Sequence, residues 1–358
     1  ATFMYLQNYY MQNTPLGYDK DEIIITNMNN NIRKSRDAFA SQVKSFSGIE
    51  EVTYAEMLLS SQDQYMGWGR KYRDKDIQFQ CLPVEPSFLK VMNVKISEGR
   101  DFREEDKAKR YGTFVFNERA RTEYGLEIGS LIDSMEIVGF MPDVKFASFR
   151  TEVTPMAFFV WGTNNWGNQP NYAYIKVKAG SDLRGAMQHV KTTLQSFDPE
   201  YPFNVRFFDE VLNGLYEKER SLSSLITLFS LIAIFISVVG VFGLVVFDSE
   251  YRKKEIGIRK VLGSTTEEII VMFNKTYIRI LCVCFVLGAP IAGYVVHRWL
   301  ENFAYKTPMY WWVYLIAFAI IAVITILTVT FQNWRAANEN PVHSIKTVSY
   351  THLRAHET

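Results

Sequence analysis

The sequence predicts an α+β extracytoplasmic domain followed by an α-helical membrane domain with three visible transmembrane helices. Residues up to about 224 show mixed strand and helix spacings, whereas most of the remainder is apolar. Three apolar runs, 225–247, 278–296 and 311–331, are long enough to cross a hydrocarbon core of about 30 Å. The first and third carry no charged residue, and the second carries only Arg279, near one end. A basic side chain there can reach the membrane interface.

The distribution of basic residues predicts the orientation of these runs. The loop between the first two runs carries Arg252, Lys253, Lys254, Arg259, Lys260 and Lys275, and the loop 297–310 carries only Arg298 and Lys306. Basic residues in short loops favour the cytoplasmic side of a membrane. The first loop is therefore expected in the cytoplasm and the domain formed by residues 17–208 outside it. The net charge of +1 gives no bulk basic excess for binding nucleic acid.

The domain 17–208 has alternating strand and helix signals. Helices are expected at 32–46, where Gly48 follows, and at 183–197. Strands are expected at 22–26, 77–82, 113–116, 135–140, 156–160, 172–177 and 203–208. This mixture, without an internal repeat, is typical of a single α+β domain.

Residues 209–224 are expected to form a stalk helix that continues into the first apolar run. Apolar residues recur in this segment at helical spacing. The stalk residues are Leu212, Leu215, Tyr216 and Lys218. Such a helix could transmit displacement across the membrane surface, and the alternative is an ordinary tether.

The basic loop has its own predicted helix, from Glu255 to Leu262, with Ile258, Val261 and Leu262 on one side. Gly263 suits a C-cap, and Ser264 to Glu267 forms a capping box that would begin the next helix. The alternative interpretation is a charged juxtamembrane segment that binds lipid headgroups.

The run Lys254-Glu-Ile-Gly-Ile-Arg-Lys-Val-Leu-Gly263 resembles the intracellular loop of MacB/FtsX-type ABC transporter permeases. Looser similarity to the family extends over 84–102, 116–120, 137–146 and 340–346. The resemblance implies a MacB-like core domain at 17–208 and an FtsX-like permease domain at 225–347. Because the family has four spans, we interpret residues 1–16 as the end of a truncated transmembrane helix and a linker. We interpret residues 348–358 as a non-native tail.

The resemblance also implies partners and a location. In the family this loop meets a separate cytoplasmic ATPase, so the expected coupling residues are Lys254, Glu255, Ile256, Gly257, Ile258, Arg259, Lys260, Val261, Leu262 and Gly263. The family further implies a homodimeric or pseudo-dimeric permease in a bacterial cytoplasmic membrane, with a possible periplasmic adaptor and contact with membrane lipid. The implied cargoes are antimicrobial peptides, macrolides or lipoproteins.

The chemistry expected of the chain is non-catalytic. It contains no Gly-x-x-x-x-Gly-Lys-Ser/Thr phosphate loop, and the three apolar runs contain no Asp or Glu. The carboxylates Asp101, Glu104 and Glu105 are interpreted as a solvated loop rather than a hydrolase site. No cofactor is expected. Small residues at four-residue spacing, Ala233/Ser237 and Ala289/Gly293, permit close helix packing, either in a dimer or within the bundle.

Two functional interpretations remain open at this point. The first is a permease subunit that couples a cytoplasmic ATPase to export or efflux. The second is an FtsX-like regulatory or sensory protein that activates a cell-wall hydrolase or a signalling partner. A membrane-tethered enzyme would need a catalytic constellation that the sequence does not show.

The predicted topology can be tested with single cysteines in intact cells. We expect a membrane-impermeant thiol reagent to label a cysteine at position 165, in a polar extracytoplasmic loop, and to spare one at position 264. The native cysteines are replaced in the background used for labelling. Labelling at position 264 with protection at position 165 would contradict the orientation.

Overall fold

The computed structural model describes all residues except 1, 60–65, 146–148, 150, 165, 167–168, 215, 253–254, 256–257, 260 and 338–358. The chain divides into two compact units. The first, the helical unit, comprises residues 1–10, 219–302 and 306–358. The second, the sheet domain, comprises residues 11–218 and the short segment 303–305.

The sheet domain is built on one mixed sheet of strands far apart in sequence. Its strand order is β11-β1-β10-β2-β4-β9-β6-β8-β5, with β3 added to β4 and β7 to β8. The strands are β1 (Ile23–Asn27), β2 (Ile49–Ala55), β3 (Met66–Tyr72), β4 (Lys75–Val84), β5 (Glu98–Gly99), β6 (Thr113–Asn117), β7 (Leu131–Ile132), β8 (Met135–Met141), β9 (Met156–Val160), β10 (Tyr172–Val177) and β11 (Val205–Phe207). The α+β class expected from the sequence is confirmed.

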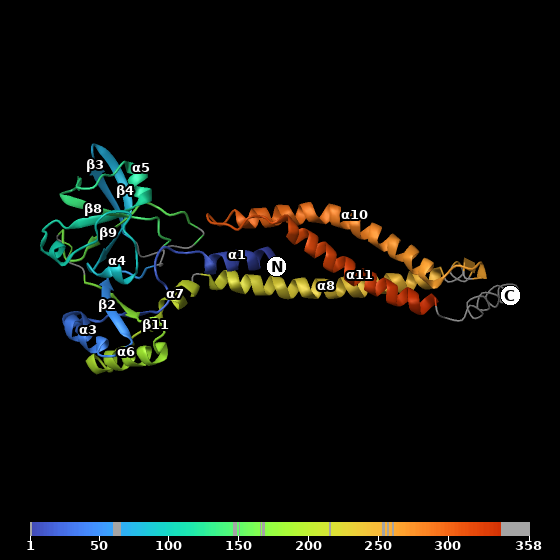
Figure 1. Ribbon diagram of the computed structural model, residues 1–358, viewed down its shortest axis with the longest axis horizontal. Coiled ribbons are helices and arrows are strands. Elements are labelled where there is room, and N and C mark those ends of the chain that lie inside the picture. Colours follow the sequence, from blue (N-terminus) through green and yellow to red (C-terminus); the bar gives the residue numbers. More distant parts are fainter. Residues whose placement is uncertain are drawn as a thin grey trace, which may run out of the picture. The chain divides into compact units, whose positions relative to one another are not determined.

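One half of the sheet is covered by two helices. Figure 1 shows α3 (Arg36–Lys44) and α6 (Leu183–Phe197) together beside β2 and β11. The Asp182 side chain caps α6 by accepting from the N–H groups of Arg184 and Gly185, at 3.1 and 3.0 Å. The apolar faces of both helices and the strands β1, β2 and β10 form one buried cluster.

The other half of the sheet has an aromatic core. Trp68, Phe79, Phe114, Phe116 and Phe159 are buried around strands β3, β4, β6 and β9. Their rings meet at tilted or edge-to-face angles, for example Phe79 and Phe116 at 4.9 Å between centroids. The short helix α5 (Glu118–Tyr124) follows β6 directly and is capped by Asn117, and α4 (Phe88–Val91) follows β4.

The two halves of the sheet meet at β2 and β4, whose register pairs Ala55 with Val84. An ionic cluster around the buried Glu85 lies just beyond this point. The Glu85 carboxylate pairs with Arg36 and with Lys107, both at 2.9 Å. The Arg36 guanidinium also stacks 4.5 Å from the Trp161 ring centroid. These contacts join α3, the end of β4 and the 3-10 turn η1 (Glu104–Ala108).

The loop 101–105, which was expected to be solvated, is only partly exposed to solvent. Glu104 and Glu105 are exposed, in line with the expectation. Asp101 is half-buried, and burial raises its pKa. Its neighbour Asp106 is fully buried and pairs with Arg100 at 2.7 Å. The segment is therefore held by internal ion pairs, which its charged sequence does not reveal.

The helical unit contains the three helices that the sequence predicts as spans. They are α8 (Glu217–Tyr251), α10 (Thr266–Leu300) and α11 (Trp311–Ala337). The segments Arg220–Asp248, Thr266–Leu300 and Trp311–Trp334 are long and apolar enough to cross a membrane. A fourth helix, α1 (Thr2–Asn13), lies at the start of the chain. Its Gln7 side chain accepts from the N–H of Thr307 at 2.7 Å, and Phe3 packs against Tyr314.

The prediction of one unbroken stalk helix over 209–224 is wrong. Helix α7 (Phe208–Gly214) ends before Tyr216, whose N–H donates to the C=O of Asn213 at 3.0 Å in a turn, and α8 begins at Glu217. Gly214 explains the break, because glycine costs about 1 kcal/mol in a helix interior relative to alanine. The expected stalk residue Leu212 packs against the core of the sheet domain, and Leu215 lies outside the described residues.

This break changes where proline should be harmful. Lys218 lies in the first turn of α8, where the N–H has no partner within the helix, so Lys218→Pro should be nearly neutral. Ser224→Pro removes a bond inside the helix and should destabilise it by about 3 kcal/mol. The measurement is the thermal unfolding of both variants in detergent micelles, with Lys218→Ala and Ser224→Ala as controls. Equal losses for the two proline variants would show that the helix continues through residue 214.

Candidate functional site

The candidate site is the loop between α8 and α10, residues 252–265, and it starts from an anchored helix end. The Arg252 side chain donates to Asp248 at 2.9 Å, one turn earlier on α8. Its guanidinium also lies over the ring of Phe273 on α10, at 5.8 Å from the centroid. Phe273 belongs to a buried cluster with Val245, Ile269 and Val329, which joins the three long helices at this end.

A short helix follows, as the sequence predicts. Glu255, Ile258, Arg259 and Val261 are helical, and the Leu262 N–H donates to the C=O of Ile258 at 3.0 Å. Glu255 and Arg259 form an ion pair of 2.7 Å across one turn. The other expected coupling residues, Lys254, Ile256, Gly257 and Lys260, lie outside the described residues.

The predicted C-cap at Gly263 is confirmed. Gly263 has a φ of +96°, in the left-handed region that glycine adopts without a Cβ penalty. The Ser264 N–H donates to the C=O of Arg259 at 2.9 Å, which is the long hydrogen bond of a Schellman motif. No atom lies within 4 Å of where a Cβ on Gly263 would be, so the backbone angle alone requires glycine.

The capping box that begins α10 lies one residue later than predicted. Thr265, not Ser264, is the N-cap: its hydroxyl accepts from the N–H of Glu268 at 3.2 Å. The Glu268 carboxylate in turn accepts from the N–H of Thr265 at 3.1 Å. The sequence Ser-Thr-Thr-Glu-Glu offers two overlapping boxes, and the Schellman bond assigns Ser264 to the preceding helix.

The loop exposes apolar side chains. Ile258, Val261 and Leu262 are 58%, 72% and 80% exposed, although they follow one another within little more than a turn. We call these three residues the apolar edge. Among the described charged groups of the loop, Glu255 and Arg259 pair with each other. The described residues of the loop thus offer an apolar contact surface next to a helix C-cap and the capping box of α10, and they include no group positioned for catalysis.

Comparison with known families assigns both parts of the chain. The model of the FtsX-like permease C-terminal domain matches residues 227–341, and that of the MacB-like periplasmic core domain matches residues 7–193. The chain belongs to the MacB/FtsX-type ABC transporter permeases. The resemblance stated from the sequence is thereby confirmed, and this chain corresponds to the permease part.

Individual relatives of this permease are distant. The Chromobacterium violaceum macrolide export ATP-binding/permease protein MacB is 23% identical over 230 residues, which is 61% of this chain and 35% of that protein. The Escherichia coli protein of the same name is 23% identical over 233 residues, with the same coverage. The chain thus aligns with about a third of the length of these curated relatives. The periplasmic region of MacB from Actinobacillus actinomycetemcomitans is 14% identical, with a TM-score of 0.41, over 55% of this chain and 94% of that one.

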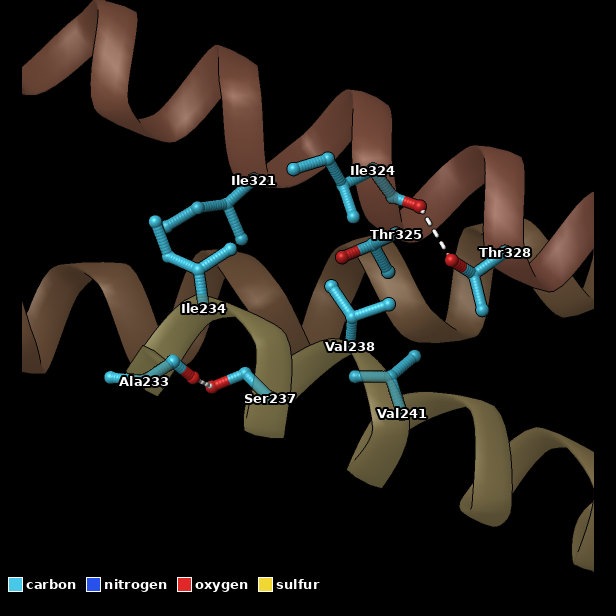
Figure 2. A pocket seen from close by; sticks show the side chains of 9 residues that line it. All are labelled: Ala233, Ile234, Ser237, Val238, Val241, Ile321, Ile324, Thr325 and Thr328. Atoms are coloured by element: carbon cyan, nitrogen blue, oxygen red, sulfur yellow. Dashed lines mark hydrogen bonds between the residues drawn. The ribbon is translucent and has the colours of Figure 1, made fainter. Parts of the chain in front are cut away.

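The small-residue pairs of the permease have different surroundings. A Cβ added to Gly293 of α10 would lie 3.3 Å from the Tyr314 hydroxyl of α11, so Gly293 serves contacts within the bundle. Ala233 and Ser237 line a pocket of about 190 Å³ between α8 and α11 (Figure 2). The hydroxyl of Ser237 donates to the C=O of Ala233, and that of Thr328 to the C=O of Ile324, both at 2.8 Å. The pocket therefore presents a largely apolar lining.

The titratable groups of the permease that the structure describes include no cluster of His, Cys, Asp and Glu arranged to hold a metal ion. Cys282 and Cys284 are exposed on the apolar helix α10, and Cys81 is buried in the aromatic half of the sheet. Burial raises the pKa of the Cys81 thiol, so this thiol is protonated and unreactive at neutral pH.

The corrected capping box can be tested with two neighbouring substitutions. Thr265→Ala removes the N-cap and should destabilise the first turn of α10 by about 1 kcal/mol. Ser264→Ala should have little effect, because the bond made by Ser264 comes from its backbone. Hydrogen exchange of residues 266–269 measures both. Faster exchange in Ser264→Ala than in Thr265→Ala would restore the box predicted from sequence.

Proposed function

We propose that this chain is the transmembrane permease subunit of an ATP-driven ABC transporter. A separate cytoplasmic ATPase would bind the loop between α8 and α10, and its ATP-driven movement would pass through the spans to the extracytoplasmic domain. The observation that carries this proposal is the apolar edge, three exposed apolar side chains next to the Gly263 C-cap. Family membership supports a permease, and the positive-inside charge pattern supports a cytoplasmic loop.

The geometry of the loop favours a protein partner over a headgroup anchor. A headgroup-binding segment needs basic side chains and no fixed backbone. Here a Schellman motif ends the short helix and a reciprocal capping box starts α10, so only the two residues Ser264 and Thr265 separate Gly263 from the next helix. Ordering one backbone residue costs about 1–2 kcal/mol of free energy. A segment that is already ordered before binding does not incur this cost when its partner docks.

We propose a bacterial cytoplasmic membrane as the location and a homodimeric or pseudo-dimeric permease with two ATPase subunits. The proposed cargo class follows that of the relatives, which are macrolide export proteins. Antimicrobial peptides and lipoproteins belong to the same proposal, as does a periplasmic adaptor. The work would be export or mechanical work outside the membrane rather than passage of small solutes through a channel.

Helix α8 is the proposed transmitter between the two regions. It is continuous from Glu217 to Tyr251 and so connects the turn after α7 to the start of the coupling loop. A continuous helix resists bending because each residue adds a hydrogen bond to the same ladder. Tyr216 and Lys218, which were expected within one stalk helix, instead flank the beginning of α8. We therefore propose that they act at this junction.

The docking of the ATPase can be tested on the apolar edge. Val261→Asp adds a charge to a side chain that is 72% exposed, so the permease should fold and insert as before. Loss of one apolar anchor together with burial of an unpaired charge should weaken association by about 2 kcal/mol or more, roughly thirtyfold. The measurement is co-purification of the ATPase encoded beside the permease, at matched expression, with the ATPase activity of the recovered complex.

Glu267→Gln is the matched control, since Glu267 lies in the nearby first turn of α10, outside the apolar edge. Charge reversal at Arg259 should act in the same direction as Val261→Asp. Normal recovery and activity of the ATPase with Val261→Asp would contradict docking at the apolar edge and would favour the alternative, a segment that binds lipid headgroups. Purified without its partner, the permease should hydrolyse no ATP above background.

A further inference from the structure

The described residues of a short loop in the sheet domain, 144–145, 149 and 151–153, are held from within that domain. Val144 is buried in the core cluster and lies against Gly17, where an added Cβ would come within 2.5 Å of it. The Lys145 N–H donates to the C=O of Leu16 at 2.9 Å, and the Tyr18 hydroxyl donates to the C=O of Lys145 at 3.4 Å. The described part of this loop is therefore a fixed support rather than a free connection.

Phe149 of this loop bonds to two distant segments through its two peptide groups. Its N–H donates to the Tyr216 hydroxyl at 3.1 Å, and its C=O accepts from the N–H of Tyr305 at 3.1 Å. Tyr216 is the turn residue between α7 and α8, and Tyr305 lies in the loop between α10 and α11. All three residues belong to the sheet domain, which includes 303–305.

Ring contacts reinforce this arrangement. The Phe149 side chain is 2% exposed and meets the rings of Tyr216 and Tyr305 edge to face, at 6.3 and 5.9 Å. The Lys145 ammonium group lies 4.9 Å from the Phe149 ring centroid and 4.5 Å from that of Tyr305. Burial lowers the pKa of Lys145, in keeping with a cation partly withdrawn from water. The Tyr305 hydroxyl also accepts from the N–H of Val153 at 3.3 Å.

We propose that Phe149 is a coupling residue that ties the turn before α8 and the loop between α10 and α11 to one point of the extracytoplasmic domain. Displacement of the first span then reaches this domain together with displacement of the other two, through two attachments instead of one. Tyr216 and Tyr305 are the positioning residues of this junction. The role of this motion in transport rests on the proposed function. The junction itself can be tested without the ATPase and without a cargo.

The test is hydrogen exchange, followed by mass spectrometry, of the full chain in lipid nanodiscs. Tyr305→Ala removes a ring and a hydroxyl acceptor from the junction. We expect exchange to accelerate in the segment 213–217, far along the chain, by about threefold to tenfold, the equivalent of one net hydrogen bond. Tyr310→Ala is the matched control, because Tyr310 is a partly exposed tyrosine of the same loop whose ring makes a tilted contact with Trp312. It should leave 213–217 unchanged.

The reciprocal variant keeps the proposal testable if Tyr305→Ala folds poorly. Tyr216→Phe removes only the acceptor of the Phe149 N–H, and should accelerate exchange of the Tyr305 N–H, because coupling between two sites acts equally in both directions. Changes confined to 301–310 in Tyr305→Ala, and to the segment around residues 149 and 216 in Tyr216→Phe, would overturn the junction. An equal response at 213–217 to Tyr310→Ala would overturn it as well.

Discussion

Each backbone N–H and C=O group inside a bilayer must find its partner within the protein, because the hydrocarbon core offers none. This constraint fixes the helical half of the permease. Its three apolar segments are continuous helices, and polar side chains within them turn back onto their own helix, as Ser237 and Thr328 do. Chemistry and recognition are consequently displaced to the helix ends, where peptide groups again become available.

At the loop between α8 and α10, the end of the short helix and the start of α10 compete for the same few residues. A Schellman motif uses the Ser264 N–H, and this leaves Thr265 as the first residue able to cap α10. Helix stop and helix start are thus joined with almost no free chain between them. The apolar edge beside this junction is exposed, and on this exposure rests our proposal that a protein partner docks there.

At the other ends of the spans, the sheet domain holds the connecting segments by aromatic contacts. The Phe149 N–H donates to Tyr216, which lies 67 residues later in the chain. Its C=O accepts from the N–H of Tyr305, which lies more than twice as far along the chain. With the two attachments proposed at Tyr216 and Tyr305, transmission of displacement does not require one unbroken stalk helix. The turn at Tyr216 interrupts the helix, and the loop at Tyr305 offers a second route for displacement.

Sequence alone determined the features that depend on local composition and periodicity. These are the three spans, the α+β class of the domain, the helix in the basic loop and Gly263 as its cap. Apolar length, charge asymmetry and the tolerance of glycine for positive φ are properties that a short window of residues carries by itself. The motif in the loop was specific enough to indicate the family, which the matched domains confirm.

Tertiary structure decided the rest, because the deciding contacts are distant in sequence or shared between neighbours. The choice of Thr265 over Ser264 depends on which of two competing hydrogen bonds forms, and the break after Gly214 is accompanied by packing of Leu212 against the core of the sheet domain. Asp106, which follows the carboxylates expected in a solvated loop, is buried and pairs with Arg100. Nothing in the sequence around Phe149 distinguishes it from other core phenylalanines, since its function follows from Tyr216 and Tyr305, which only the folded chain brings to it.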